Sequence, residues 1–232
     1  MAWNSAHIDK EFDREVRALL ADTDEDGNLP IVQLGEPVLR MQTEQYDGQL
    51  SQKTLVKLIE LMRSTMLAAP GVGLAGPQIG LGLAIAVLED HMRDDADDPR
   101  GIGELPFTTI INPHYEPVDD QTASFYEGCL SFDGYQAVRK RYVHIKATWM
   151  DEFGNKHEEL MHYWPARIFQ HETDHLNGEV YIDKAETRSL TTYDNLEDYI
   201  FDLCESYDSP EELKENTPKN IDKYIKKHKL QR

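Results

Sequence analysis

His171, Glu172 and His175 have the residue types and the spacing of a metal-assisted hydrolytic centre. Residues four apart share a face of an α-helix, so a helix here would let both imidazoles bind one metal ion. Glu172 follows the first histidine and could reach the open position of that ion. We expect it to act there as a general base on a metal-bound water, rather than as a ligand.

A metal ion held by two imidazoles needs a third protein ligand. Zinc peptidases commonly take theirs from downstream, where Glu179 and Glu186 are candidates. Upstream, Cys129 offers a thiolate, and the preceding Gly128 allows the backbone to come close to an ion. A single cysteine is more often a small buried packing residue, so the residues alone leave the third ligand open.

The segments around these histidines indicate how they are positioned. The metal-binding helix is expected to begin at Pro165 and to stop at Gly178, since proline suits a first helical turn and glycine a helix end. Other helices are predicted at 11–21, 50–69 and 193–205, and strands at 81–88, 108–112, 123–127, 142–150 and 156–163. Strands before a central helix, without βα alternation, favour an α+β fold with antiparallel or mixed sheets around that helix.

Composition and charge limit the classes of function. The chain has 232 residues, enough for a single domain with helical extensions at both ends. We predict an N-terminal helical extension (1–29), a catalytic region (30–190) and a C-terminal helix with a basic tail (191–232). The net charge of −19 argues against a DNA-binding protein. Neither a secretory signal nor a membrane span is evident, so we expect a cytoplasmic protein.

Three segments, in this order along the chain, resemble the signature motifs of the peptide deformylase family. They are GVGLAGPQ at 71–78, EGCLS at 127–131 and QHETDH at 170–175. The resemblance spans roughly residues 30–190. It implies removal of the N-formyl group from the formylmethionine of nascent bacterial or organellar polypeptides. It also implies one divalent ion bound by Cys129, His171 and His175, physiologically Fe²⁺, with Zn²⁺, Ni²⁺ or Co²⁺ able to occupy the site.

The resemblance further implies roles for neighbouring residues. The side chain of Gln78 and the backbone N–H of Leu130 would stabilise the oxyanion together with the metal. Gly73 and Gly128 would contact the substrate backbone, and Ile168 would line the pocket for the methionine side chain.

Glu127 is expected to support the ligands from behind, with Arg139 as its partner. Two departures from the family pattern concern neighbouring positions. Gly76 replaces the usual alanine, which is expected to loosen the turn before Gln78. Gln136 stands where many members carry an arginine that binds the substrate backbone.

Other functions remain open from the sequence. A metallopeptidase could use the same helix with a different third ligand, and a catalytically silent metal-binding protein could keep the ion for structure alone. Residues 213–232 hold seven Lys or Arg residues against two acidic ones. Some bacterial deformylases dock on the ribosome through a C-terminal helix, so this tail could contact ribosomal RNA. A solvated tail that neutralises the acidic body is the alternative.

Overall fold

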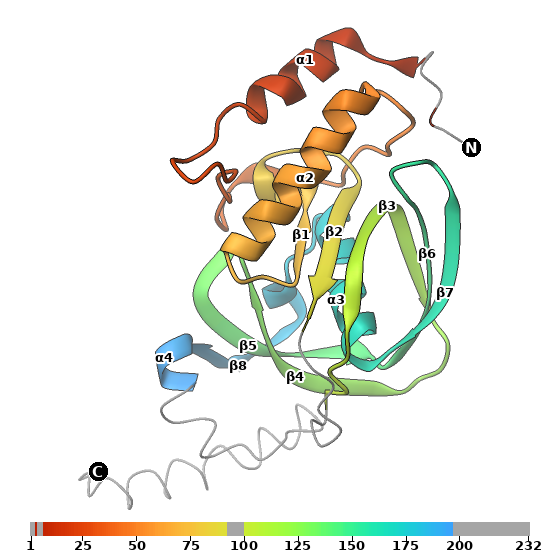
Figure 1. Cartoon of the computed structure of the whole chain (residues 1–232). Coiled ribbons are helices and arrows are strands. Elements are labelled where there is room, and N and C mark those ends of the chain that lie inside the picture. The colour runs from red at the N-terminus through yellow and green to blue at the C-terminus, as the bar shows by residue number, and fades with distance from the viewer. Residues whose placement is uncertain (1–2, 4–6, 92–99, 197–232) are drawn as a thin grey trace, which may run out of the picture.

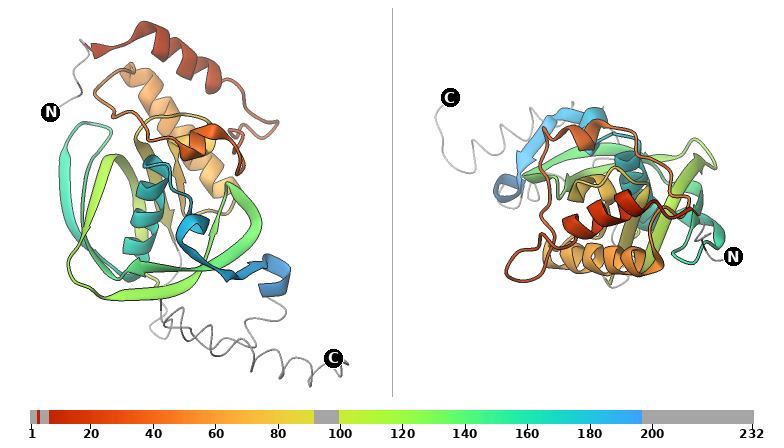
Figure 2. Two further views of the ribbon diagram at one scale, coloured as in Figure 1. Left: turned by 180° about the vertical axis from the view of Figure 1, so that it is seen from behind. Right: turned by 90° about the horizontal axis from the view of Figure 1, so that it is seen from above.

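The helix that carries both histidines, α3 (Tyr163–Leu176), lies in the middle of the molecule with strands of two sheets around it (Figures 1 and 2). The computed structural model describes residue 3 and residues 7–91 and 100–196. Within this part of the chain, α3 contacts strands of both sheets. The predicted α+β class with antiparallel sheets is confirmed.

Two antiparallel sheets provide the strands. The larger has the order β1-β2-β3-β6-β7, with bounds Gly73–Ala75 (β1), Ile85–Asp90 (β2), Leu105–Pro117 (β3), His144–Met150 (β6) and Lys156–His162 (β7). The smaller has the order β4-β5-β8, with bounds Thr122–Cys129 (β4), Phe132–Tyr142 (β5) and Ala185–Thr192 (β8). β1 is an edge strand, so among the described residues one side of its backbone has no strand partner.

Two N-terminal helices cover one side of β1 and β2, with α2 against the strands and α1 on α2. The longer, α2 (Gln52–Ala68), contacts both strands, and Ser51 caps its first turn as the sequence predicts. The shorter, α1 (Lys10–Leu19), packs on α2. The buried carboxylate of Asp13 accepts a hydrogen bond from the backbone N–H of Ser51 at 2.8 Å. This bond ties α1 to the start of α2.

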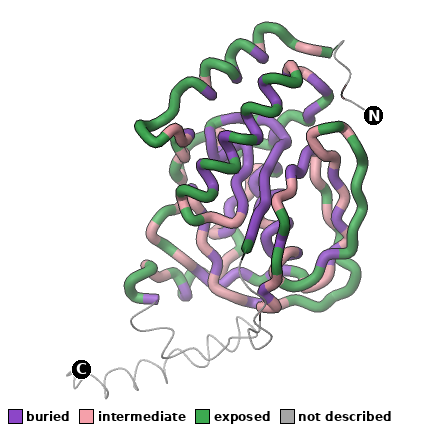
Figure 3. The backbone as a smooth tube through the Cα atoms, viewed as in Figure 1, coloured by how far each residue is buried: buried purple, intermediate pink, exposed green. Residues whose placement is uncertain are grey.

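β1 and β2 are buried along their whole length, and the core lies on both sides of them (Figure 3). The first side receives the apolar stripe of α2, made up of Leu55, Leu58, Met62 and Met66. The second receives the apolar residues of α3, among them Ala166, Ile168 and Phe169. Because this packing holds α3 against β1, it also positions the histidines that α3 carries.

The structure differs from the expectations mainly in the smaller sheet. No strand is predicted between residues 128 and 141 or after residue 163, yet the structure has the eleven-residue strand β5 and the strand β8 there. Both strands owe their form to pairing, since β5 bonds β4 on one side and β8 on the other. α3 begins at Tyr163, two residues before the expected Pro165, and Pro165 fits because first-turn N–H groups lack helical acceptors.

Other boundaries shift as well, and the predicted strand 108–112 extends to Leu105–Pro117. The predicted strand 81–88 begins only at Ile85, because the residues before it bond to Glu44 instead: Leu83 forms an isolated β-bridge with Glu44, and Ala84 donates its backbone N–H to the Glu44 carbonyl at 2.8 Å. The predicted helix 193–205 is represented by α4 (Tyr193–Asn195). Its remainder and the basic tail lie outside the described residues. None of the described helices is long and apolar enough to span a bilayer.

The turn of the β6–β7 hairpin depends on one carboxylate, that of Asp151. It accepts hydrogen bonds from the backbone N–H groups of Phe153 (2.9 Å) and Asn155 (2.8 Å), and it pairs with His157 at 2.9 Å. Partial burial raises the pKa of Asp151, but the bonds from His157 and from the turn outweigh it and lower the pKa to about 2. The folded state therefore favours the charged carboxylate.

Replacing Asp151 with alanine should lower the free energy of unfolding by about 1–2 kcal/mol at pH 7. The contribution is complete above the ordinary pKa of the unfolded chain, 3.8, and is lost as the pH falls through about 2. The difference between wild type and variant should therefore shrink below pH 4 in urea titrations at pH 7, 5, 4 and 3. Glu152→Ala, in the same turn, is the matched control. A difference that stays constant down to pH 3 would contradict this account.

Candidate metal centre

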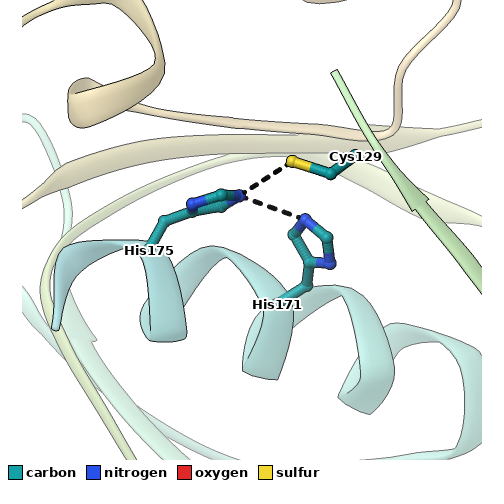
Figure 4. Close-up of side chains that lie close together, drawn as sticks. All are labelled: Cys129, His171 and His175. Carbon is teal, nitrogen blue, oxygen red and sulfur yellow. Dashed lines mark hydrogen bonds between the residues drawn. The ribbon is translucent and has the colours of Figure 1, made fainter. Parts of the chain in front are cut away.

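Three side chains converge at the C-terminal half of α3 (Figure 4). The Nε2 atom of His175 lies 3.2 Å from the Nε2 atom of His171 and 3.2 Å from the Sγ atom of Cys129. All three residues are largely buried. The histidines come from successive turns of α3, and the cysteine is the last residue of β4.

The three atoms fit a divalent metal ion. Metal–nitrogen bonds of about 2.0–2.1 Å in a tetrahedral site place two ligand nitrogens about 3.3 Å apart, close to the separation seen here. Burial lowers the pKa of His175 well below its usual range, so its imidazole is neutral, as a ligand must be. One thiolate and two imidazoles form a donor set that suits several borderline metals.

A tight hairpin turn positions the cysteine. Residues 130–131 connect β4 to β5, and the backbone N–H of Ser131 points at the Sγ atom of Cys129 at 3.4 Å. The turn is held from the N-terminal side of the domain. Leu34 donates its backbone N–H to the carbonyl of Ser131 at 2.7 Å, and the Gln33 side chain donates to the carbonyl of Leu130 at 3.0 Å. The sulfur is therefore placed by contacts between segments far apart in the sequence.

Glu127 orients His171 through the ring nitrogen that does not face the other candidate ligands. Its carboxylate lies 2.6 Å from Nδ1 of His171, an arrangement that directs the lone pair of Nε2 toward the other two ligands. The same carboxylate receives two hydrogen bonds from Arg141, at 2.8 and 2.5 Å, and one from Arg167 at 2.8 Å. Burial raises the pKa of Glu127, but the Arg141 guanidinium and His171 outweigh it and hold that pKa well below its usual range. Glu127 is thus a permanent anion beside the candidate ligands.

The expected pairing of Glu127 with Arg139 is not what the structure shows. Arg139 instead donates to Glu179 at 2.8 Å and lies 3.6 Å from Asp174. The partner of Glu127 is Arg141, two residues further along β5 on the same face of the sheet. Arg141 reaches both Glu127 and Asp174, since these carboxylates lie on either side of its guanidinium. Glu179, a candidate third ligand from the sequence, is occupied by ion pairs.

Arg141 and Arg167 are supporting residues that the sequence argument did not find. Spacing alone could have indicated Arg167, because it precedes His171 by four residues and so shares its helix face. Arg141 could have been predicted only if residues 132–142 had first been recognised as a strand. Residues 139 and 141 then alternate onto one face, and both become candidates for pairing with Glu127.

Glu172 lies beside the three candidate ligands and is almost fully buried. Its Oε2 atom has no hydrogen-bond partner among the described residues. Burial raises the pKa of this carboxyl to about 7, against the lowering effect of His171 and Arg141. A divalent cation beside it would favour the charged form. A buried carboxylate oxygen without a partner is costly, which points to a bound water or ligand at this position.

Gly73 allows Glu172 to occupy this place. A Cβ atom added to Gly73 would overlap the Glu172 carboxylate. Gly73→Ala should therefore displace Glu172 and lower kcat/KM for the reaction of this centre at least tenfold, with bound metal retained because no ligand is touched. Gly82→Ala is the control, since a Cβ there meets no atom within 4 Å. Equal turnover in wild type and Gly73→Ala, compared in one assay, would show that Glu172 tolerates the methyl group.

Gln78 is held rigidly. Its Oε1 accepts the backbone N–H of Ala75 at 2.8 Å, and its Nε2 points at the Sγ atom of Cys129 at 3.6 Å. A Cβ atom on Gly76 would lie 2.7 Å from the carbonyl oxygen of Leu83, and the loosening expected from this glycine stays a prediction. Gly76 therefore permits close backbone packing, and Gln78 remains beside the candidate ligands.

The expected substrate-binding residues lie around the same centre. Gly128 directly precedes Cys129 in β4 and pairs with Gln136 of β5. Leu130, in the turn, touches the position that a Cβ on Gly71 would take, at 2.8 Å. Ile168, one turn before His171, is buried in the core cluster between α3 and the larger sheet. Their roles toward a substrate remain predictions.

Comparison with known proteins agrees with this geometry. The family model described as polypeptide deformylase matches residues 28–190. "Peptide deformylase 1" of Bifidobacterium longum is 65% identical over 199 residues, covering 86% of this chain and 92% of the relative. "Peptide deformylase 3" of Streptomyces avermitilis is 51% identical over 168 residues, covering 72% and 75%.

Solved structures of peptide deformylases are also similar to this chain. The Met-Ala-Ser-bound class I type b peptide deformylase of Acinetobacter baumannii superposes with a TM-score of 0.61 at 28% identity, covering 68% of this chain and 98% of that one. The peptide deformylase of Thermotoga maritima gives 0.58 at 34% identity, covering 68% and 97%. The extent of these matches and the centre built from Cys129, His171 and His175 lead to one conclusion: this chain is an enzyme of the peptide deformylase family.

Proposed function

We propose that the enzyme removes the formyl group from the N-terminal formylmethionine of newly made polypeptides. The observation that carries this proposal is the convergence of Cys129, His171 and His175 beside the unpartnered carboxylate of Glu172. This arrangement would provide three metal ligands and a general base at one buried site. Formyl is the smallest acyl group, so a buried centre of this kind can accommodate it.

We assign the following catalytic roles to the residues of the chain. The metal, when bound by the three ligands, supplies a Lewis acid that activates water and polarises a carbonyl. Glu172 takes the proton of the attacking water and passes it to the leaving amine. The Gln78 amide and the backbone N–H of Leu130 lie beside Cys129 and would donate hydrogen bonds to the oxyanion.

The free edge of β1 would bind the peptide. An extended substrate can add to an edge strand through main-chain hydrogen bonds, which tolerate any sequence. Gly73 lies on this edge and Gly128 beside the cysteine, so the substrate backbone could approach both without obstruction by side chains. Ile168 is proposed to contact the methionine side chain.

Family membership also supports proposals for the bound metal, the cellular location of the protein and its domain division. We assign Fe²⁺ as the physiological ion, with Zn²⁺, Ni²⁺ and Co²⁺ as functional replacements. Relatives in Bifidobacterium and Streptomyces support a bacterial cytoplasmic enzyme acting on nascent chains. Residues 30–190 would form the catalytic region, supported by the family match to 28–190. Contact of the basic tail with the ribosome is retained as a prediction and can be tested by co-sedimentation after truncation beyond residue 210.

The decisive experiment is an anaerobic purification followed by metal analysis and an assay of formate release. We expect about one iron per chain and formate release from formyl-Met-Ala-Ser. Cleavage of unformylated peptides without formate release would indicate a metallopeptidase. Bound metal with neither activity would indicate a structural ion. Either result would overturn the proposed function.

A further inference from the structure

The C-terminal end of the described chain approaches the proposed substrate site through Tyr193. This residue follows β8 and begins α4. A Cβ added to Gly128 would lie 2.7 Å from the Tyr193 hydroxyl oxygen. The hydroxyl is therefore in contact with the glycine that directly precedes the ligand Cys129.

Tyr193 is held at this place by the surrounding structure. β8 pairs with β5 up to Thr192, which lies opposite Tyr135, and so brings Tyr193 to the end of β5 where the hairpin turn lies. Leu196 is buried after it and anchors the segment. The hydroxyl is also close enough to Tyr181 to contribute to the raised pKa of that phenol, which is due first to burial and then to Cys129 and other acids.

Among the described residues, the Tyr193 hydroxyl is available to a ligand. Tyr193 is 42% exposed, and its hydroxyl makes no hydrogen bond to any residue in 7–91 or 100–196. The side-chain amide of Gln136 lies at the same glycine, with Nε2 3.6 Å from the Gly128 Cβ position. Two neutral donors, a phenol and a carboxamide, therefore lie at Gly128.

We infer that Tyr193 is a substrate-positioning residue, which donates its hydroxyl hydrogen bond to a backbone carbonyl of the peptide beyond the formylmethionine. This inference rests on the proposed function. With Gln136 it supplies neutral donors at the place where this chain lacks an arginine. The ligand class that fits is a peptide of at least three residues, bound through its main-chain carbonyls rather than through a terminal carboxylate.

The test compares Tyr193→Phe with wild type on two substrates, formyl-Met-Ala-Ser and formyl-Met. One neutral hydrogen bond corresponds to about a threefold to tenfold change in binding. We expect the ratio of kcat/KM for the longer substrate to that for the shorter to fall by this factor, through KM rather than kcat. The matched control is Tyr142→Phe, which removes a hydroxyl from an exposed tyrosine at the far end of β5.

A second comparison tests the neutral character of the site. For wild type, kcat/KM for formyl-Met-Ala-Ser with a free C-terminus and with an amidated C-terminus should agree within a factor of about two, because the donors at Gly128 in the described part of the chain, Tyr193 and Gln136, are neutral. Gln136→Arg should create a preference for the free carboxylate.

The outcomes separate the two claims. An unchanged ratio in Tyr193→Phe, or an equal fall on both substrates, would overturn the role of Tyr193 while leaving the deformylase activity standing. If wild type releases no formate, the proposed function fails. Titration of the product Met-Ala-Ser into both proteins then still decides on Tyr193, since weaker binding to the variant supports the contact and equal binding overturns it.

Discussion

Glu172→Gln should lower kcat for formate release by about 10²–10⁴-fold and leave the bound metal in place. The glutamine has the size of the native side chain but cannot accept a proton. The metal should remain because the candidate ligands are Cys129, His171 and His175, and the Glu172 carboxylate has an oxygen without a partner in the described structure. Turnover at saturating formyl-Met-Ala-Ser and iron content of the same preparation are the two measurements.

The control for this prediction is Glu159→Gln, which makes the same chemical change on an exposed position of β7. It should behave as wild type in both measurements. Formate release by Glu172→Gln at the native rate would remove Glu172 as the base. Loss of metal from the variant would instead make Glu172 a ligand or a support of the ligands.

Arg141→Met should destabilise the folded protein by about 3–5 kcal/mol and reduce its metal content. Arg141 joins two buried carboxylates, Glu127 at 2.8 and 2.5 Å and Asp174 at 2.8 Å. Removing the guanidinium leaves both with less compensating charge in a place where water cannot solvate them. Glu127 also orients His171, so a displaced Glu127 should weaken metal binding. Urea unfolding and metal analysis of the purified variant measure the two effects.

The neighbouring Arg139→Met separates this role from a general need for positive charge. Arg139 pairs mainly with Glu179, which also has Lys184 as a partner, so its removal leaves no carboxylate unpaired. We expect the loss of stability to be less than half as large, with metal content unchanged. If Arg141→Met does not fold, Arg141→Lys serves instead, because it keeps the charge but cannot bridge both carboxylates. Equal effects at positions 139 and 141 would contradict the pairing seen in the structure.

The features that local sequence predicts correctly are those that depend on neighbours along the chain. The cap at Ser51 and the apolar stripe of α2 follow from helix geometry over a few residues. The common face of His171 and His175 depends only on helical periodicity. The three motifs likewise needed no tertiary information to indicate the family.

Strand β5 and the ion pairs of its arginines cannot be predicted from local sequence. The segment after Cys129 has charged residues and glycine, and nothing local predicts an eleven-residue strand. It becomes one because β4 and β8 pair with it and because its arginines meet buried carboxylates from β4 and α3. The choice of Arg141 over Arg139 as the partner of Glu127 is made by these long-range contacts.

The same division applies to the candidate centre. Local sequence was enough to propose two imidazoles and a base on one helix, but the residues alone left Cys129, Glu179 and Glu186 open as the third ligand. The fold brings Cys129 to His175, occupies Glu179 with ion pairs and brings Tyr193 to Gly128. The contacts of Cys129 with His175, Arg139 with Glu179 and Tyr193 with Gly128 join segments forty or more residues apart. They depend on how the sheets and α3 pack, because side-chain spacing along the chain carries no information about contacts between distant segments.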